Sequence, residues 1–177
     1  RPARRGPGPS VPPFPGTASR VRRLLGHCAL PFQRIEYSAD DGSPRTADFL
    51  AKNPNGKVPT IRLADGSYLF ESDAILWYLA EGTPFLPADR WLRAQVLQWM
   101  FFEQYSHEPY IAAPRFIVKH LPPDSPRRSE LPKRLEQGRA ALGVMESRLK
   151  DRKYLVGERY SIADIALYAY THVAHEA

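Results

Sequence analysis

The chain has 177 residues, of which 43% are hydrophobic and 11% aromatic, so it can bury a substantial core and global disorder is excluded. Its net charge of +6 would suit a nucleic-acid binder, but residues 1–35 hold seven Arg and no Asp or Glu, whereas the remainder holds 18 basic and 19 acidic residues. The body is therefore nearly neutral, which argues against nucleic acid as a partner and leaves only a basic tail that binds polyanions non-specifically.

The first third of the chain alternates disordered, helical and extended patterns. Residues 1–16 are rich in Pro, Gly and Arg and are expected to be disordered. A short helix ending near Pro31 follows, with apolar residues at helical spacing: Val21, Leu24, Leu25 and Cys28. Apolar and polar residues alternate over 32–37, which predicts a strand, and 46–52 predicts a brief helix after a polar turn.

Dense turn chemistry over residues 53–57 introduces the next elements. We expect a strand over 58–63, a hairpin turn, a second strand over 68–70, and a helix from 71–73 to about 80. The order is therefore helix–strand–helix–strand–strand–helix, an α/β arrangement.

From residue 87 onward the strand signals disappear. The apolar pattern predicts a long helix over 90–119, kinked at Pro109 and Pro114. A second helix is predicted from Leu131 to Lys150 and a third, very apolar helix from Ile162 to about His175. The second half of the chain is thus expected to be all helical.

Cysteine use and apolar runs indicate the compartment. Cys28 is the only cysteine, so neither an intrachain disulfide nor a cysteine-rich metal site can form, and we expect no metal. No apolar run approaches the roughly 20 residues that span a bilayer. We therefore expect a soluble, cytoplasmic protein without a membrane partner, in which Cys28 fills the core.

The pair Val58-Pro59 and Glu71-Ser72 carries the strongest chemical signal. A Val-Pro bond before an edge strand is a candidate cis peptide. An extended peptide could pair with the Val58 backbone like an added strand, and the helix start at Ser72 favours an anion. Two simpler interpretations stay open, in which Ser72 is only an N-cap and Val58-Pro59 only a turn.

The run NPNGKVPTI, followed twelve residues after Pro59 by ESDAILWYLAE, resembles the N-terminal domain of bacterial glutathione transferases. The resemblance implies a thioredoxin-like domain over 17–83 without a regular first strand, then a helical domain over 88–177 that is shorter than in the family. It also implies a cytoplasmic detoxification enzyme, a homodimer, that conjugates glutathione, as co-substrate, to a small electrophile. The implied glutathione-binding residues are Val58, Glu71 and Ser72, together with Lys57 and Arg45.

The sequence departs from the family pattern at the positions that activate the glutathione sulfur. The bacterial motif S-G-N-C-x-K-V-R-x-L-L aligns with residues 15–25 and places Pro15 and Ala18 at the Ser and Cys positions. Neither side chain can donate to a thiolate, so Thr17 and Ser19 are the remaining catalytic candidates. Because this alignment places no thiol-activating side chain at the Ser and Cys positions, a non-catalytic binding or interaction module with the same fold is the alternative function.

Two further motifs lie in the second half. Ser161 and Asp164 form a capping-box pattern before an apolar helix, and the same S-x-A-D arrangement is typical of the helical domain of glutathione transferases. Its role there is structural, as is that of Pro59. The helix around His107 and Tyr105 resembles the one that lines the second-substrate pocket in bacterial members, although a His on a helix is more often simply solvated.

Overall fold

The computed structural model describes residues 16–37 and 42–177. Its helices and strands are α1 (Thr17–His27), α2 (Ala47–Leu50), β1 (Thr60–Arg62), β2 (Tyr68–Phe70), α3 (Ser72–Ala80), α4 (Arg90–Phe102), α5 (Glu108–His120), α6 (Leu131–Leu149) and α7 (Ile162–Thr171). A π-helical turn, η2 (Glu103–His107), joins α4 to α5, and short 3₁₀ turns are η1 (Ser43–Arg45), η3 (Pro126–Glu130) and η4 (Ala174–Glu176). The segment 1–15, predicted to be disordered, and part of the predicted turn lie outside the described residues.

The β1–β2 hairpin forms as the sequence predicts. Its strands pair antiparallel, with Thr60 opposite Phe70 and Arg62 opposite Tyr68. Asp65 shapes the turn, because its carboxylate accepts hydrogen bonds from the Ser67 backbone N–H (2.9 Å) and hydroxyl (2.6 Å). Helix α3 follows directly, which confirms the predicted strand–turn–strand–helix order over 58–80.

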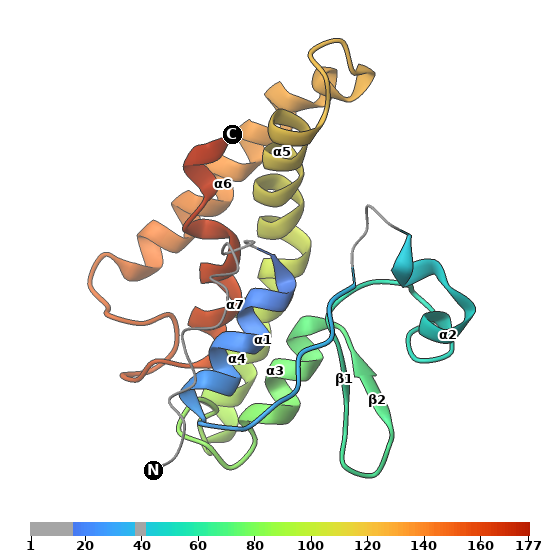
Figure 1. The fold of residues 1–177 in the computed structure, drawn as a ribbon. Helices are drawn as coiled ribbons and strands as arrows, with labels where there is room; N and C mark the ends of the chain where they lie inside the picture. Colours follow the sequence, from blue (N-terminus) through green and yellow to red (C-terminus); the bar gives the residue numbers. More distant parts are fainter. Residues whose placement is uncertain (1–15, 38–41) are drawn as a thin grey trace, which may run out of the picture.

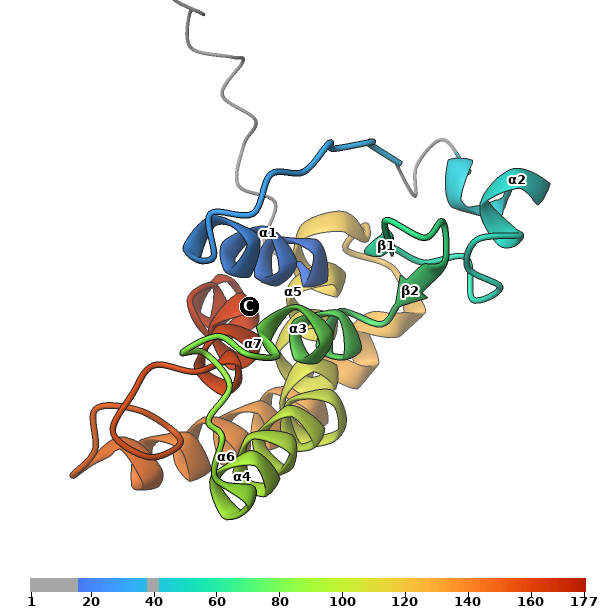
Figure 2. The same ribbon diagram turned by 90° about the horizontal axis from the view of Figure 1, so that it is seen from below.

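The strand predicted for residues 32–37 is wrong. This segment is extended but pairs with no strand among the described residues, so its alternating pattern yields no ladder. Its apolar side chains consequently stay open, with Phe32 52% and Ile35 70% exposed. Figure 2 shows the segment running outside the body from α1 toward α2. Alternation predicts an extended backbone, but a strand also needs a neighbour.

The long helix predicted over 90–119 is present as an unbroken helical run over 90–120, with a local change of hydrogen-bond pattern. Its α-helical parts α4 and α5 are joined by the π turn η2, which ends two residues before Pro109. Pro109 lies in the first turn of α5 and Pro114 inside that helix. The helix predicted from Leu131 is confirmed as α6, and the last helix is interrupted after Thr171 before the turn η4.

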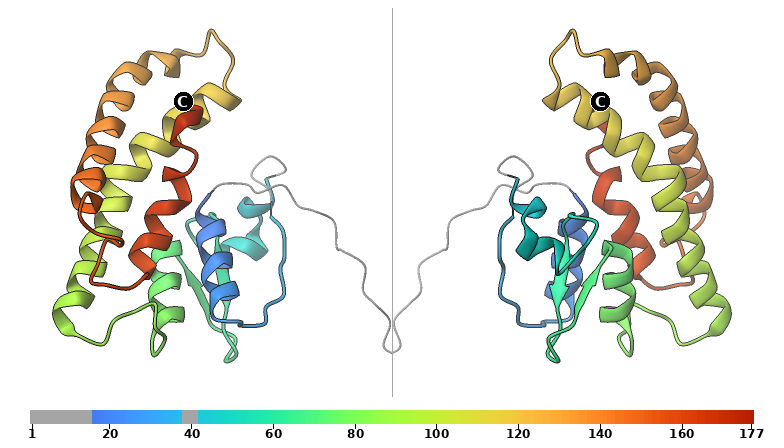
Figure 3. Two further views of the ribbon diagram at one scale, coloured as in Figure 1. Left: turned by 90° about the vertical axis from the view of Figure 1, so that its left-hand side faces the viewer. Right: turned by 90° about the vertical axis from the view of Figure 1, so that its right-hand side faces the viewer.

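One hydrophobic core joins the two halves of the chain. Leu24 of α1 and Leu76 of α3 are fully buried in the same cluster as Val96 of α4 and Ile165 of α7. Helix α1 packs against both α3 and α7. Figures 1 and 3 show α1 and α3 lying between the hairpin and the long helices α4 to α7. The starts of α1 and α3 are therefore held next to the helical half.

Candidate functional site

The turn before β1 is organised by one buried amide. Asn53 is 2% exposed, and its Nδ2 donates to the Lys57 carbonyl oxygen (2.7 Å) and the Thr60 hydroxyl (3.2 Å). Its Oδ1 accepts from the Asn55 backbone N–H at 2.9 Å. All three bonds lie within eight residues, so the motif closes on itself, and the Val58-Pro59 bond that follows is cis, as predicted.

Val58 and Ser72 flank the same end of the hairpin. The ladder ends with Thr60 opposite Phe70, and Val58 lies two residues before Thr60 while Ser72 lies two residues after Phe70. Ser72 is the first residue of α3 and is buried, while Val58 is 42% exposed. The partly exposed Val58 and the helix start at Ser72 therefore border the same end of the hairpin, and the amide groups that begin α3 favour an anion there.

Glu71 has an unusual backbone between these two residues. Its φ of 66° is positive, which is uncommon for a non-glycine residue, and its ψ is 115°. Its carboxylate accepts a hydrogen bond from Asn55 Nδ2 at 3.3 Å, which ties it to the preceding turn. Such backbone conformations cost about 1–3 kcal/mol and gather at ligand sites. The exposed Glu71 carboxylate is available to a cation at this point.

Thr17, the first residue of α1, contacts the Val58 backbone; Val58, Glu71, Ser72 and Thr17 together are called the corner. The Thr17 hydroxyl donates to the Val58 carbonyl oxygen at 3.2 Å, across 41 residues of sequence. Ser19, the other catalytic candidate, donates instead to the Gly16 carbonyl oxygen of its own turn at 2.7 Å. The two candidates therefore differ, because only Thr17 contacts a residue of the predicted glutathione-binding set.

The two predicted cations lie on the turn side of this corner. Lys57 and Arg45 are exposed. Gly56 between them has φ 61°, and a Cβ built on it would lie 3.2 Å from Arg45 Nη1 and 2.9 Å from the Pro44 carbonyl oxygen. Glycine thus lets the Arg45 guanidinium approach the turn backbone, which places one cation beside the loop that ends at Val58.

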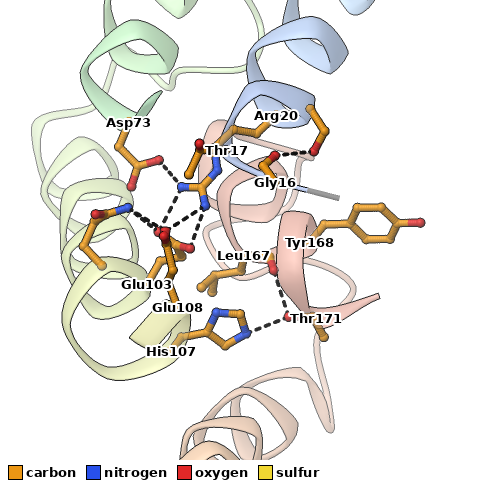
Figure 4. Close-up of polar contacts among 12 residues, drawn as sticks. Gly16, Thr17, Arg20, Asp73, Glu103, His107, Glu108, Leu167, Tyr168 and Thr171 are labelled. Carbon is orange, nitrogen blue, oxygen red and sulfur yellow. Dashed lines mark hydrogen bonds and ion pairs between the residues drawn. The ribbon is translucent and has the colours of Figure 1, made fainter. Parts of the chain in front are cut away.

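A buried charge cluster behind the corner was not predicted from the sequence (Figure 4). Arg20 Nη1 donates to Asp73 Oδ1 (2.7 Å) and Glu103 Oε2 (2.9 Å), and Nη2 donates to Glu103 Oε1 (2.7 Å) and Glu108 Oε2 (3.3 Å). Gln104 Nε2 donates to Glu103 at 2.8 Å and to Glu108 at 3.2 Å. Arg20 and Glu103 have fully buried side chains. The only sequence signal was a cation among the apolar positions of α1.

The cluster holds three carboxylates against one guanidinium. Burial raises the pKa of Glu103 to about 8 despite the lowering effect of Arg20, and the carboxylates of Asp73 and Glu108 act in the same direction as burial. Burial also raises the pKa of Asp73. Burial lowers the pKa of Arg20, but Glu103 and Asp73 raise it by more, so its charge is permanent. The cluster therefore retains a proton more readily than separate carboxylates would.

The predicted second-substrate residues lie in different environments. His107 is fully buried, with Nε2 2.9 Å from the Thr171 hydroxyl. That hydroxyl also lies 2.8 Å from the Leu167 carbonyl oxygen, and both contacts are satisfied together when Nε2 carries the hydrogen. Tyr105, by contrast, is 85% exposed. Enclosure of the His107 ring contradicts a direct contact with a second substrate, whereas Tyr105 is open to one.

The buried imidazole of His107 is held neutral. Burial lowers the pKa of His107 to about 4, and the nearby charge of Arg20 acts in the same direction. Its Nδ1 is buried and has no hydrogen-bond partner in the part of the chain that the structure describes. A neutral ring avoids placing a second cation beside Arg20.

The capping box at α7 is present. The Asp164 carboxylate accepts from the Ser161 backbone N–H and from the Leu155 backbone N–H, each at 2.9 Å. The Ile162 N–H donates to the Phe85 carbonyl oxygen at 3.0 Å, which ties this helix start to the segment that follows α3. Ser161 and Asp164 thus anchor the last helix in the core.

Within residues 16–37 and 42–177, no cluster of three or more His, Cys, Asp or Glu side chains has a geometry suited to a metal ion. The helices described there are also too short or too polar to span a bilayer. The candidate site is therefore the corner of Val58, Glu71, Ser72 and Thr17, backed by the Arg20 cluster. Its chemistry is that of backbone amides, hydroxyls and charged side chains.

Three known proteins show what the chain is similar to. A glutathione S-transferase from Pseudomonas fluorescens Pf-5 is 52% identical with a TM-score of 0.86, over 92% of this chain and 82% of that one. A glutathione transferase from Burkholderia graminis, solved with two glutathione molecules per subunit, is 30% identical with a TM-score of 0.82, over 92% and 70%. Elongation factor 1-gamma-B of Xenopus laevis is 37% identical over 123 residues, which are 70% of this chain and 28% of that protein.

The family models divide the chain as its architecture does. Residues 16–81 match the glutathione S-transferase N-terminal domain and residues 99–176 match the C-terminal domain. These matches confirm the predicted thioredoxin-like domain followed by an all-helical domain. The chain belongs to the glutathione S-transferase family.

Proposed function

We propose that this chain binds glutathione at the Val58–Ser72 corner and conjugates its thiolate to a small electrophile. One observation carries the proposal: the Thr17 hydroxyl lies 3.2 Å from the Val58 carbonyl oxygen, so the candidate activating group meets the candidate peptide-binding backbone. The glutathione bound to the Burkholderia graminis relative supports the choice of ligand.

Glutathione would bind as a short extended strand. Its cysteinyl backbone would pair with the exposed Val58 backbone, and its γ-glutamyl carboxylate would meet the amides that begin α3 at Ser72. The exposed Glu71 carboxylate would receive the ligand's ammonium group, and the cations of Arg45 and Lys57 would face the glycine carboxylate. Each charge of the tripeptide would thus meet an opposite charge or a helix start.

Thr17 would stabilise the thiolate. Its single hydroxyl hydrogen now goes to the Val58 carbonyl oxygen. In the complex the hydroxyl would rotate to donate to the sulfur, while the Val58 carbonyl oxygen accepts from the cysteinyl N–H of glutathione. The thiol proton leaves to solvent, and the start of α1 favours the resulting anion. The sulfur then attacks the electrophile, and with an aryl halide a carbon–sulfur bond forms as the carbon–halogen bond breaks and halide leaves.

A non-catalytic module is the second candidate function. It is favoured by the elongation factor relative, whose name is not that of a transferase although 70% of this chain matches it. The absence of a side-chain donor at Pro15 and Ala18 favours it as well. In this case the corner would bind glutathione, or hold a partner, without turnover.

The test is a glutathione titration by calorimetry together with a conjugation assay on an aryl halide. If the protein is a transferase, both binding and turnover are expected. Thr17→Val should then lower kcat by about 10²-fold, as expected for losing one donor to a developing anion. Ser19→Ala is the matched control and should change kcat less than 2-fold. Binding without turnover would favour the module, and no binding would refute the glutathione site.

We also propose that two copies associate through α4. The residues Trp91, Ala94, Gln98 and Phe101 recur every three or four positions along α4, and all are exposed. Such a seam matches itself in a second copy related by a two-fold axis. A charge inside it, as in Phe101→Glu, should convert the dimer to a monomer in sedimentation, whereas an already monomeric wild type would refute the interface.

We propose that the protein resides in the cytoplasm, because glutathione stays reduced there and the Cys28 thiol is free. Detoxification of electrophiles is the corresponding biological role. Cell fractionation tests the location, and recovery of the protein in a secreted or membrane fraction would contradict it.

A further inference from the structure

The Arg20 guanidinium lies where four elements meet. It projects from α1, and its acceptors come from α3 (Asp73), from the π turn η2 (Glu103) and from α5 (Glu108). Its side chain is fully buried. A buried cation is costly unless acceptors surround it. These three carboxylates accept from both Nη atoms and so set the guanidinium geometry, while the buried Nε has no hydrogen-bond partner among the described residues.

The positions of these partners point to the site. Arg20 is one helical turn after Thr17, so both side chains lie on one face of α1. Asp73 immediately follows Ser72 at the start of α3. The Nη1 atom alone spans from α3 to the helical half, with 2.7 Å to Asp73 and 2.9 Å to Glu103. One guanidinium thus joins the two helix starts that carry the candidate site.

The other end of this connection is rigid. Glu103 accepts from both Nη atoms, which is the two-pronged geometry that orients a guanidinium most strictly. It begins the π turn, a feature found frequently at functional sites, and Gln104 Nε2 holds its Oε2 at 2.8 Å. The helical half therefore supplies a fixed reference to which α1 and α3 are both aligned.

We infer that Arg20 is a positioning residue for the glutathione site, because it sets the separation between the Thr17 hydroxyl and the start of α3 at Ser72. This inference rests on the proposed function. Lysine could not replace it, since an ammonium cannot direct parallel hydrogen bonds to Glu103 while also reaching Asp73. A shift of about 1 Å between the two helix starts would separate the sulfur-activating hydroxyl from a ligand seated at Ser72.

The experiment compares full-length Arg20→Lys with Arg93→Lys. Arg93 is the matched control, because it makes a two-pronged pair with Glu81 (3.1 and 2.8 Å) that is partly exposed and belongs to neither helix start. Circular dichroism first establishes that each variant is folded. Calorimetry then gives the Kd for glutathione, and steady-state kinetics gives KM for glutathione and for the electrophile separately.

We expect Arg20→Lys to raise the Kd and KM for glutathione about 10-fold, to lower kcat, and to leave KM for the electrophile unchanged. Arg93→Lys should match the wild type. A purely structural role would lower only the active fraction, and therefore kcat alone. Amide hydrogen exchange should also quicken over residues 17–20 and 72–75 in Arg20→Lys.

The failures can be told apart. Wild-type protein that does not bind glutathione refutes the proposed function, whatever the variants do. If the wild type binds glutathione and folded Arg20→Lys shows the same Kd and the same amide hydrogen exchange, only the positioning role of Arg20 is overturned. If Arg20→Lys does not fold, Asp73→Asn replaces it, because it weakens only the link to α3, and unchanged Kd there overturns the inference equally.

Discussion

The two sides of the candidate site are held in different ways. On the hairpin side, the hydrogen bonds of Asn53 and Asn55 join residues no more than 16 apart. On the α1 side, Thr17 reaches Val58 across 41 residues and Arg20 reaches Glu103 across 83. Local turn chemistry thus shapes the hairpin side of the candidate site, whereas its α1 side depends on long-range contacts, among them a buried ion pair.

The largest expected effect comes from breaking the long-range side. Arg20→Met leaves the buried Glu103 carboxylate without its cation, and we expect the free energy of unfolding in urea to fall by about 3–5 kcal/mol. Arg93→Met removes a partly exposed pair of similar geometry and should lower the free energy of unfolding far less. Equal losses in the two variants would show that burial of the Arg20 cluster contributes nothing extra.

The pH dependence of stability tests the same interior. The folded-state pKa of His107 is lowered to about 4 from an ordinary value near 6.5. Above about pH 6.5 the imidazole is neutral in both the folded and the unfolded state, and it does not reduce the free energy of unfolding. As the pH falls below about 6.5, the unfolded state takes up the proton first, and the free energy of unfolding decreases by up to about 3 kcal/mol at pH 4.

Replacement of His107 by Gln removes the titrating group. Urea unfolding of wild type and His107→Gln between pH 7 and 4 should therefore diverge in slope below pH 6.5, with the wild type losing more. Parallel curves would mean that the imidazole is as accessible to protons in the folded state as in the unfolded one.

A smaller effect is expected on the local side. Asn53→Ala removes two donated bonds and one accepted bond at a buried position, and should cost about 1–3 kcal/mol of stability. Because these bonds shape the loop that ends at Val58, the affinity for glutathione should fall together with the stability. The control Asn55→Ala removes the exposed contact to Glu71, and a loss there as large as in Asn53→Ala would contradict the central role of Asn53.

The sequence predicted well where neighbours in the chain are also neighbours in space. The 53–57 turn, the β1–β2 hairpin, the α3 start and the Ser161–Asp164 capping box all follow from short-range patterns, and all are present. It failed at residues 32–37, because alternation predicts an extended backbone but not the partner strand that would make a ladder. It also could not separate Thr17 from Ser19, two hydroxyls in one helical turn.

The sequence alone sufficed for the family, for the order of elements from residue 46 onward, and for the turn, hairpin and helix start around Val58, Glu71 and Ser72. Tertiary structure alone decided that Arg20 is buried, that Glu103 and Asp73 meet it, and that His107 lies inside the core and not on a pocket wall. The physical reason is range: turns and caps are closed by hydrogen bonds between nearby residues, while the burial of a charge depends on which distant helices pack around it.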